Sequence, residues 1–187
     1  DRSVMSTTPA LGSLLLERPA AHDVAAIHRI YSDPRVWAHF PSGRQATIEQ
    51  TDQMVQLWLQ GWERDGLSTW LIRDAETGEL LGNGGCSVRA EAFWNLGYRL
   101  AFEAHGRGVA SAVASYAVEQ AQLTRPDLPI VAYLLEHNLA SARVAQKAGL
   151  TLRHRGPDAG NPDPEAVRLV FADRDLNADQ LASALTA

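Results

Sequence analysis

The chain has 187 residues, of which 45% are hydrophobic and 21% are charged, and its formal net charge at pH 7 is −5. This length and composition predict one globular domain and exclude a disordered chain. The acidic balance argues against nucleic acid as a partner, because nucleic-acid binding depends on cations that neutralise phosphates. Cys86 is the only cysteine, so an internal disulfide and a zinc site of several cysteines are both excluded.

The sequence also lacks the signals of membrane and metal proteins. No apolar run approaches the roughly 18 residues that a bilayer-spanning helix needs, and we find no signal-peptide pattern. We therefore expect a cytoplasmic protein with no membrane partner. The six histidines are scattered without the spacing of ligands, so no metal is expected.

Turn-forming residues and hydrophobic periodicity predict an α+β chain of seven strands and four helices, in which the three middle strands form an antiparallel meander. The expected strands cover 14–17, 68–73, 80–88, 93–100, 129–135, 150–155 and 166–172. The expected helices follow Asp23, follow the capping box at Thr47, and cover 109–123 and 139–148. Small residues dominate 109–123, which predicts a helix pressed close to the sheet. The glycines of 82–85 predict a bulge.

We expect three parts along the chain. Residues 1–12 are polar and without pattern, and we expect them to be disordered or, for residues 1–4, left over from expression cloning. The domain is expected over residues 13–176. Residues 177–187 are expected to form a C-terminal tail, with a short helix as one option.

The loop after strand 93–100 contains two glycines, Gly106 and Gly108, directly before the helix that starts at Val109. The first N–H groups of a helix bind phosphates, and glycines let a phosphate approach the backbone closely. Alone, this pattern is more often a tight turn without a ligand. It is neither a Walker A motif nor a dinucleotide-binding fingerprint, because the required Lys and third glycine are missing.

A second polar segment follows the apolar run 129–135, where Asn138 and Ser141 stand at the start of a helix. Together, the segments resemble the GNAT superfamily of N-acetyltransferases, in particular the branch whose members acetylate ribosomal-protein N-termini at alanine or serine. The resemblance covers about residues 14–175. The matching motifs are Arg18-Pro19, Asp23, Asp33-Pro34-x-Val36, Gly97-Tyr98-x-Leu100, Gly106-Arg107-Gly108-x-Ala110 and Asn138-x-x-Ser141-x-Arg143-Val144-x-x-Lys147-x-Gly149.

The resemblance implies the GNAT fold, with a mixed, mostly antiparallel sheet of about six to seven strands that splays near its middle and is flanked by about four helices. It also implies acetyl-CoA as the co-substrate. It implies that backbone N–H groups of 107–110 hold the CoA pyrophosphate and that the end of strand 93–100 pairs with the pantetheine. Asn138 is then expected to hydrogen-bond the pantetheine arm. The implied cofactor-binding residues are Leu100, Ala101, Phe102, His105, Gly106, Arg107, Gly108, Val109, Ala110, Ser111, Asn138, Ser141 and Lys147.

Ser141 is the candidate catalytic acid, because the tyrosine that many superfamily members place in this helix is Ala145 here. An alkyl thiol has a pKa of about 8.5, so its release needs only modest help from a hydroxyl donor. A backbone N–H near Leu100 or Phe102 is the expected donor to the developing oxyanion. Ser141 has an alternative role as an ordinary first-turn serine.

The general base stays open, because Asn95 stands where related sequences often carry a glutamate. Five side chains remain as candidates: Glu91, Glu103, Glu136, His39 and His137. Deprotonating a lysine at pH 7 costs about 4.6 kcal/mol, whereas an α-amino group costs only about 1.2 kcal/mol. A site without a strong base therefore favours an α-amino or similarly weakly basic acceptor.

Several residues have two interpretations. Trp37, His39 and Phe40 are expected either to form a substrate-binding wall or to pack as an ordinary loop. His105 either contacts CoA or stabilises its loop, and Lys147 either contacts CoA or serves as a cation at a helix C-terminus.

The sequence thus predicts an N-acetyltransferase that moves an acetyl group to a primary amine by direct attack in a ternary complex. A protein N-terminus is the expected acceptor. The alternatives are a small-molecule enzyme for an aminoglycoside or polyamine, and a non-catalytic CoA-binding module. A homodimer is a further option.

Overall fold

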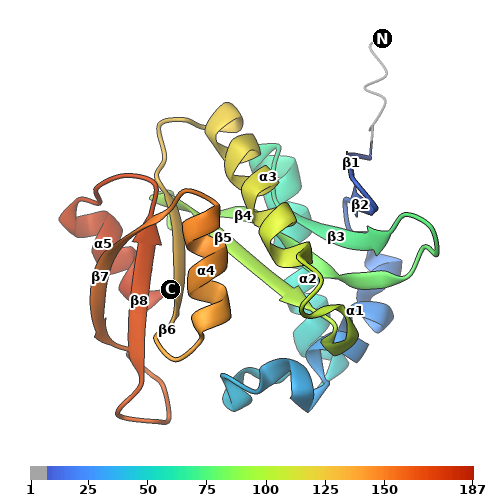
Figure 1. Cartoon of the computed structure of the whole chain (residues 1–187), viewed down its shortest axis with the longest axis horizontal. Helices are drawn as coiled ribbons and strands as arrows, with labels where there is room; N and C mark the ends of the chain where they lie inside the picture. Colours follow the sequence, from blue (N-terminus) through green and yellow to red (C-terminus); the bar gives the residue numbers. More distant parts are fainter. Residues whose placement is uncertain (1–7) are drawn as a thin grey trace.

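The computed structural model describes residues 8–187, and an open eight-stranded sheet crosses its middle in the order β1-β2-β3-β4-β5-β6-β8-β7 (Figure 1). The strands are β1 (Ala10–Leu11), β2 (Leu14–Glu17), β3 (Thr69–Asp74), β4 (Leu80–Arg89), β5 (Phe93–Leu100), β6 (Ile130–Leu135), β7 (Thr151–Pro157) and β8 (Val167–Ala172). The α-helices are α1 (Val24–Tyr31), α2 (Ile48–Asp65), α3 (Val109–Thr124), α4 (Leu139–Lys147) and α5 (Ala178–Thr186). The α+β class and the seven longer strands confirm the prediction.

The helix ends follow from their capping residues. At the start of α2, the Thr47 hydroxyl accepts from the Gln50 N–H at 3.4 Å and the Gln50 side chain accepts from the Thr47 N–H at 3.1 Å, which is the predicted capping box. Gly66, at φ +72°, ends the same helix in the left-handed conformation. These caps fix where α2 begins and ends.

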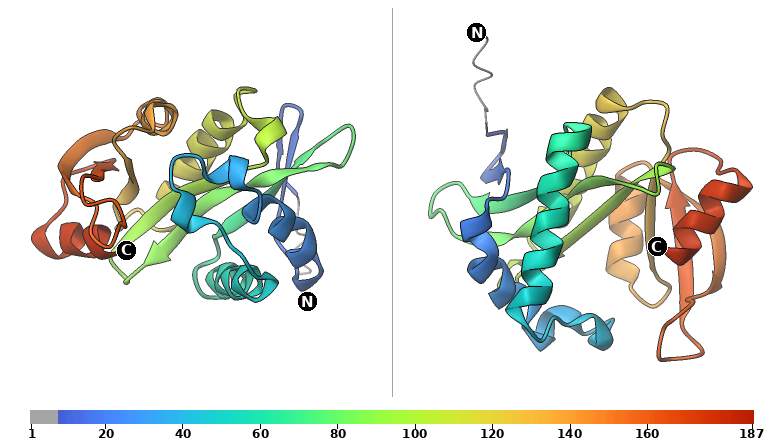
Figure 2. Two further views of the ribbon diagram at one scale, coloured as in Figure 1. Left: turned by 90° about the horizontal axis from the view of Figure 1, so that it is seen from below. Right: turned by 180° about the vertical axis from the view of Figure 1, so that it is seen from behind.

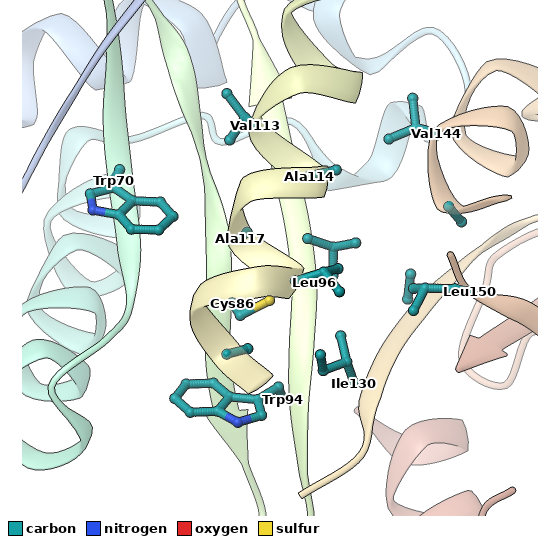
Figure 3. Close-up of a cluster of buried hydrophobic side chains, with 14 of the residues drawn as sticks. Trp70, Cys86, Trp94, Leu96, Val113, Ala114, Ala117, Ile130, Val144 and Leu150 are labelled. Atoms are coloured by element: carbon teal, nitrogen blue, oxygen red, sulfur yellow. The ribbon is translucent and has the colours of Figure 1, made fainter. Parts of the chain in front are cut away.

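The helices cover the two faces of the sheet in two groups (Figure 2). Helices α3 and α4 lie on one face, and α1, α2 and α5 lie on the other. In α3, Ala114, Ala117 and Ala121 are almost completely buried. They belong to the same core cluster as Trp94 and Leu96 of β5 (Figure 3). Small side chains thus let α3 approach the sheet closely, as its composition predicted.

The sheet opens between β5 and β6. These two strands run parallel and pair only through Trp94 with Ile130 and Asn95 with Val131. Beyond that point β5 stays paired with β4 up to Leu100, while β6 turns away and pairs with β8 (Figure 1). All other strand pairs are antiparallel. The predicted mixed sheet that splays near its middle is confirmed.

The N-terminal end contains more structure than we expected, and the C-terminal end contains the short helix that was one option. Ala10 and Leu11 pair with β2 through a Gly12-Ser13 turn, so the segment expected to be disordered ends in β1. Two residues are too short to show an alternating pattern, which is why the sequence did not indicate β1. Residues 1–7 lie outside the described residues. In the C-terminal tail, residues 177–187, Asn177 caps α5, which packs on β6 and β8.

No helix within residues 8–187 is long and apolar enough to cross a membrane.

A bulge shapes β4 next to the opening. Ile72 of β3 pairs with Gly82 and Arg73 pairs with Leu80, so Leu81 is an extra residue in β4. This confirms the predicted bulge, which begins one residue before the glycines. At Gly82, φ is +152° and an added Cβ would lie 2.3 Å from the Arg99 carbonyl oxygen of β5. Only glycine allows this close approach of the two strands.

We predict that Gly82→Ala lowers the free energy of unfolding by about 2 kcal/mol or more, because the new Cβ would meet backbone that cannot yield easily. Urea denaturation measures this change. Gly97→Ala on β5 is the control, since its Cβ would meet no atom within 4 Å. Equal losses in the two variants would contradict the steric explanation.

Candidate active site

The opening between β5 and β6 forms a cleft of about 750 Å³. Its walls come from β5, from the loop and first turn of α3, from α4 and β6, and from the segment that includes η2 (Pro34–Trp37). The cleft thus brings together three segments that are far apart in the sequence. Each segment contains residues that the sequence predicted to bind the cofactor or the substrate.

The glycine loop forms one end of the cleft. Gly106 and Gly108 both have positive φ, +76° and +74°, and Gly108 is the N-cap of α3. An added Cβ at either position would meet no protein atom within 4 Å, so backbone conformation and not crowding within the chain requires glycine here. Val109, Ala110 and Ser111 line the cleft behind this loop. The arrangement directs the positive end of the α3 dipole toward the cleft.

The edge of β5 that faces β6 has no strand partner from Leu96 to Leu100. We expected a ligand to pair with Leu100–Phe102, but those peptide groups are largely used within the chain. The Leu100 carbonyl contacts His105 Nε2 at 3.2 Å, and the Ala101 N–H donates to the Leu81 carbonyl at 2.8 Å. The open edge therefore lies earlier in β5. The His105 contact favours the interpretation that this side chain stabilises its loop.

Ser141 lies in the first turn of α4 and reaches across the opening to β5. The Asn138 side chain caps α4 by accepting from the Ser141 N–H at 3.2 Å. The Ser141 hydroxyl lies 3.0 Å from the Tyr98 hydroxyl, which burial keeps protonated by raising its pKa. Ala145 is buried one turn further along α4. A tyrosine therefore does stand beside the candidate acid, although it comes from β5.

In the sequence, Tyr98 stands out only as part of a family motif, and no role follows from it there. Alternation along β5 contains a signal for its orientation, because Leu96, Tyr98 and Leu100 must point to the same face of the sheet. That face is the one covered by α3 and α4. The contact with Ser141 itself depends on how far α4 stands from β5, which the sequence does not reveal.

The predicted wall residues all line the cleft, on the side of α1 and α2. Trp37 is 7% exposed, and its ring N–H donates to the Tyr31 carbonyl at 2.8 Å, so it is also a packing residue. Phe40 is 36% exposed at the mouth. His137, before α4, contacts the His39 carbonyl at 3.1 Å through Nε2. Packing as an ordinary loop and forming a wall of the cleft are thus compatible roles for this segment.

Most acidic candidates for the general base are committed to ion pairs or lie elsewhere. Arg155 holds Glu136 in an ion pair and lowers the pKa of that carboxyl. Glu103 pairs with Arg35 at 3.0 Å, and Glu91 lies in the β4–β5 turn, at the opposite end of β5. Of the five candidates, His39 is the one that lines the cleft.

Three predicted cofactor residues do not line the cleft. Ala101 directly follows β5 and packs against the hydrophobic core, and the Arg107 guanidinium lies 3.6 Å from Asp74. Lys147 is exposed in the last turn of α4, where a cation favours the helix dipole. The remaining ten predicted cofactor residues surround the cleft. Within residues 8–187, no group of three or more His, Cys, Asp or Glu side chains is placed to hold a metal ion.

Comparison with known proteins agrees with this geometry. Residues 13–151 match the acetyltransferase (GNAT) domain family. The chain belongs to this family, and it is therefore an acetyl-CoA-dependent acetyltransferase.

Three relatives illustrate the similarity. An uncharacterized protein of Bacillus subtilis (strain 168), YkkB, is 29% identical over 125 residues, which cover 65% of this chain and 71% of YkkB. The acetyltransferase structure from Agrobacterium tumefaciens C58 has a TM-score of 0.71 at 27% identity and covers 90% of this chain and 95% of its own. The ribosomal L7/L12 α-N-protein acetyltransferase RimL, solved with coenzyme A, has a TM-score of 0.71 at 23% identity. The match covers 90% of this chain and 99% of the RimL chain. The RimL likeness shows the shared fold.

We predict that Tyr98 and Ser141 are coupled through their hydroxyls by about 0.5–1.5 kcal/mol. A double-mutant cycle of Tyr98→Phe and Ser141→Ala, measured by chemical denaturation, gives this coupling energy. Additive losses would show that the hydrogen bond between β5 and α4 contributes nothing to stability.

Proposed function

We propose that the chain is an N-acetyltransferase that moves the acetyl group of acetyl-CoA to the α-amino group of a protein N-terminus. The observation that carries the proposal is the opening after Asn95, where an unpaired strand edge lies between a glycine loop and two hydroxyl groups. One end of the cleft suits phosphates, and the other contains proton donors. This is the arrangement that a direct transfer between a thioester and an amine needs.

The cleft fits the donor through groups that the chain leaves free. The N–H groups at the start of α3 are available for the pyrophosphate, and Gly106 and Gly108 leave open space in front of them. The unpaired edge of β5 from Leu96 onward offers N–H and C=O groups to the amides of the pantetheine arm. RimL, which has the same fold, was solved with coenzyme A.

We assign the acid role to Ser141. The Tyr98 hydroxyl stays protonated, and either hydroxyl of the pair can donate to the other. When Tyr98 donates to Ser141 Oγ, the Ser141 proton is free to point toward the sulfur of the leaving thiolate. Acetyl-CoA supplies the reactive thioester. During transfer the amine nitrogen forms a bond to the acetyl carbon and the carbon–sulfur bond breaks, with Ser141 donating a proton to the sulfur. The amine nitrogen gives up one proton to His39 or water, and solvent returns one to Ser141, so the products are the amide and the CoA thiol. No side chain of the enzyme is acylated.

The surroundings of the amine support an α-amino group as the acceptor. Asp158 is the one carboxylate among the described residues that line the cleft, and Arg168 pairs with it at 2.6 Å. No free carboxylate therefore stands ready to deprotonate a lysine, which costs about 4.6 kcal/mol at pH 7. His39 lines the cleft and can take the proton of an α-amino group, whose deprotonation at pH 7 costs only about 1.2 kcal/mol.

The same electrostatics weigh against the alternatives. An aminoglycoside or polyamine carries several cations, and this cleft offers them no unpaired carboxylate among the described residues. A non-catalytic module would explain Asn95 and Ala145, but it would not require hydroxyls of Tyr98 and Ser141 to meet at the opening. The homodimer and the cytoplasmic location stay predictions.

Thiol release tests the proposal. With acetyl-CoA present, free CoA thiol should appear only when a peptide with a free N-terminus is added, and the N-acetylated peptide should form in equal amount. An N-terminally blocked peptide with an internal lysine is the matched control and should stay unmodified. Turnover of polyamines but not of peptides would contradict the proposal and show that the chain acetylates small molecules instead.

We predict that Gly108→Ala weakens acetyl-CoA binding about tenfold, because a residue with Cβ disfavours the left-handed conformation that directs the α3 N–H groups to the phosphates. Calorimetric titration measures the affinity. Gly66→Ala is a closely matched control, with φ +72° and ψ 1° against φ +74° and ψ 7° at Gly108, but at the far end of α2. Both variants should lose similar stability, and a similar loss of affinity would contradict the loop's role.

We predict that Ser141→Ala lowers kcat about tenfold to a hundredfold and changes acetyl-CoA affinity little, because the thiolate loses its proton donor. Steady-state kinetics and calorimetry separate the two effects. Leu139→Ala, at an exposed position of the same turn, controls for general damage to α4. An unchanged kcat in Ser141→Ala would remove Ser141 from the mechanism.

A further inference from the structure

Among the described residues, three arginines line the cleft, and Arg99 differs from the other two. Arg35 lies 2.7 Å from Asp33 and 3.0 Å from Glu103, and Arg168 lies 2.6 Å from Asp158. No carboxylate of the described chain lies within 4.0 Å of the Arg99 guanidinium. Arg99 therefore contributes an uncompensated positive charge to the cleft.

The Arg99 side chain is held in place by neutral groups. Its guanidinium carbon lies 3.7 Å from the centroid of the Trp37 ring, and Nη1 donates to the Val36 carbonyl at 3.4 Å. Burial lowers the pKa of Arg99, although a guanidinium remains protonated in proteins. A desolvated cation without a counter-ion is costly, and an anion supplied by a ligand would offset that cost.

Alternation along β5 places Arg99 on the acceptor side of the opening. Tyr98 points to the face of α3 and α4, so Arg99 points to the face of α1 and α2. Its cross-strand neighbour Asn83 confirms this orientation, because Asn83 hydrogen-bonds the Tyr31 hydroxyl of α1 at 2.9 Å. The glycine loop precedes α3, on the other face. Arg99 is thus directed away from the phosphate end and toward the segment that contains Trp37.

We infer that the acceptor of this enzyme is an amine that also carries an acidic group, a carboxylate or a phosphate, and that Arg99 binds this group. One face of the guanidinium lies on Trp37, and its one hydrogen bond within the described chain is the 3.4 Å bond from Nη1 to the Val36 carbonyl. Its other N–H groups are therefore left for hydrogen bonds to the oxygens of the acid. The inference rests on the proposed amine acetylation. For a peptide acceptor, it specifies an acidic side chain close to the N-terminus.

Matched ligand pairs test the inference directly. The pairs are the dipeptide amides Ser-Glu-NH₂ and Ser-Gln-NH₂, 4-aminobutyrate and 4-aminobutanamide, and O-phosphoethanolamine and ethanolamine. Each compound is titrated calorimetrically into the protein with and without CoA, which measures acceptor binding without turnover. Thiol release with acetyl-CoA is measured in parallel, so a failure of the amine acetylation is visible separately.

Arg99→Gln and Arg99→Lys are compared with Arg35→Gln, which removes a charge from the same cleft that Asp33 and Glu103 already neutralise. In the wild type, the acidic member of at least one pair should bind about tenfold or more tightly than its neutral partner. Arg99→Gln should abolish this preference, Arg99→Lys should retain part of it, and Arg35→Gln should retain it fully.

The outcomes separate the possible roles of Arg99. Preference for the carboxylate pairs or for the phosphate pair identifies the acid group and supports the inference. Equal binding within every pair, or no binding of any acidic member, overturns it even if thiol release proceeds. If Arg99→Gln weakens the binding of both members of each pair equally, Arg99 is a packing residue and the inference is overturned. A loss of CoA affinity in that variant would assign Arg99 to the donor and overturn the inference as well.

Discussion

The separation of β5 from β6 after Asn95 is the constraint on which the site depends. Only two residue pairs join these strands, and beyond them β6 pairs with β8 alone. The separation leaves one edge of β5 without a partner. It also sets the distance over which Ser141 of α4 reaches Tyr98. A fully paired sheet would bury the same residues and leave no cleft.

The two faces of the sheet divide the work at this opening. On one face, α3 brings the glycine loop and α4 brings Asn138 and Ser141, the residues that we propose for the acetyl donor and for the proton source. On the other face, the segment after α1 brings Trp37 and His39 beside Arg99. Successive residues of one strand, Tyr98 and Arg99, thereby point to opposite faces of the opening, and our proposals place them on opposite sides of the reaction. This is a direct consequence of the period of two in a β-strand.

Charge pairing gives the cleft its chemical character. Arg168 holds Asp158, which lines the cleft, and Arg155 holds Glu136, which does not, so no unpaired carboxylate lines the cleft among the described residues. Arg99 has no such partner within the described chain, so the side of the cleft that we propose for the acceptor is positive although the whole chain is acidic. The net charge of −5 therefore says little about the acceptor, because recognition depends on the few groups that the fold leaves unpaired.

The sequence by itself determined most of the elements and the family. Capping residues such as Thr47, the small residues of α3 and the glycine loop act locally, so they can be recognised in the sequence without knowledge of the fold. The sequence did not indicate β1, the hydroxyl pair of Tyr98 and Ser141, or the unpaired state of Arg99. Those features join segments far apart in the chain, and only the tertiary structure decided them, because a side chain's partners depend on the distances that packing sets between elements.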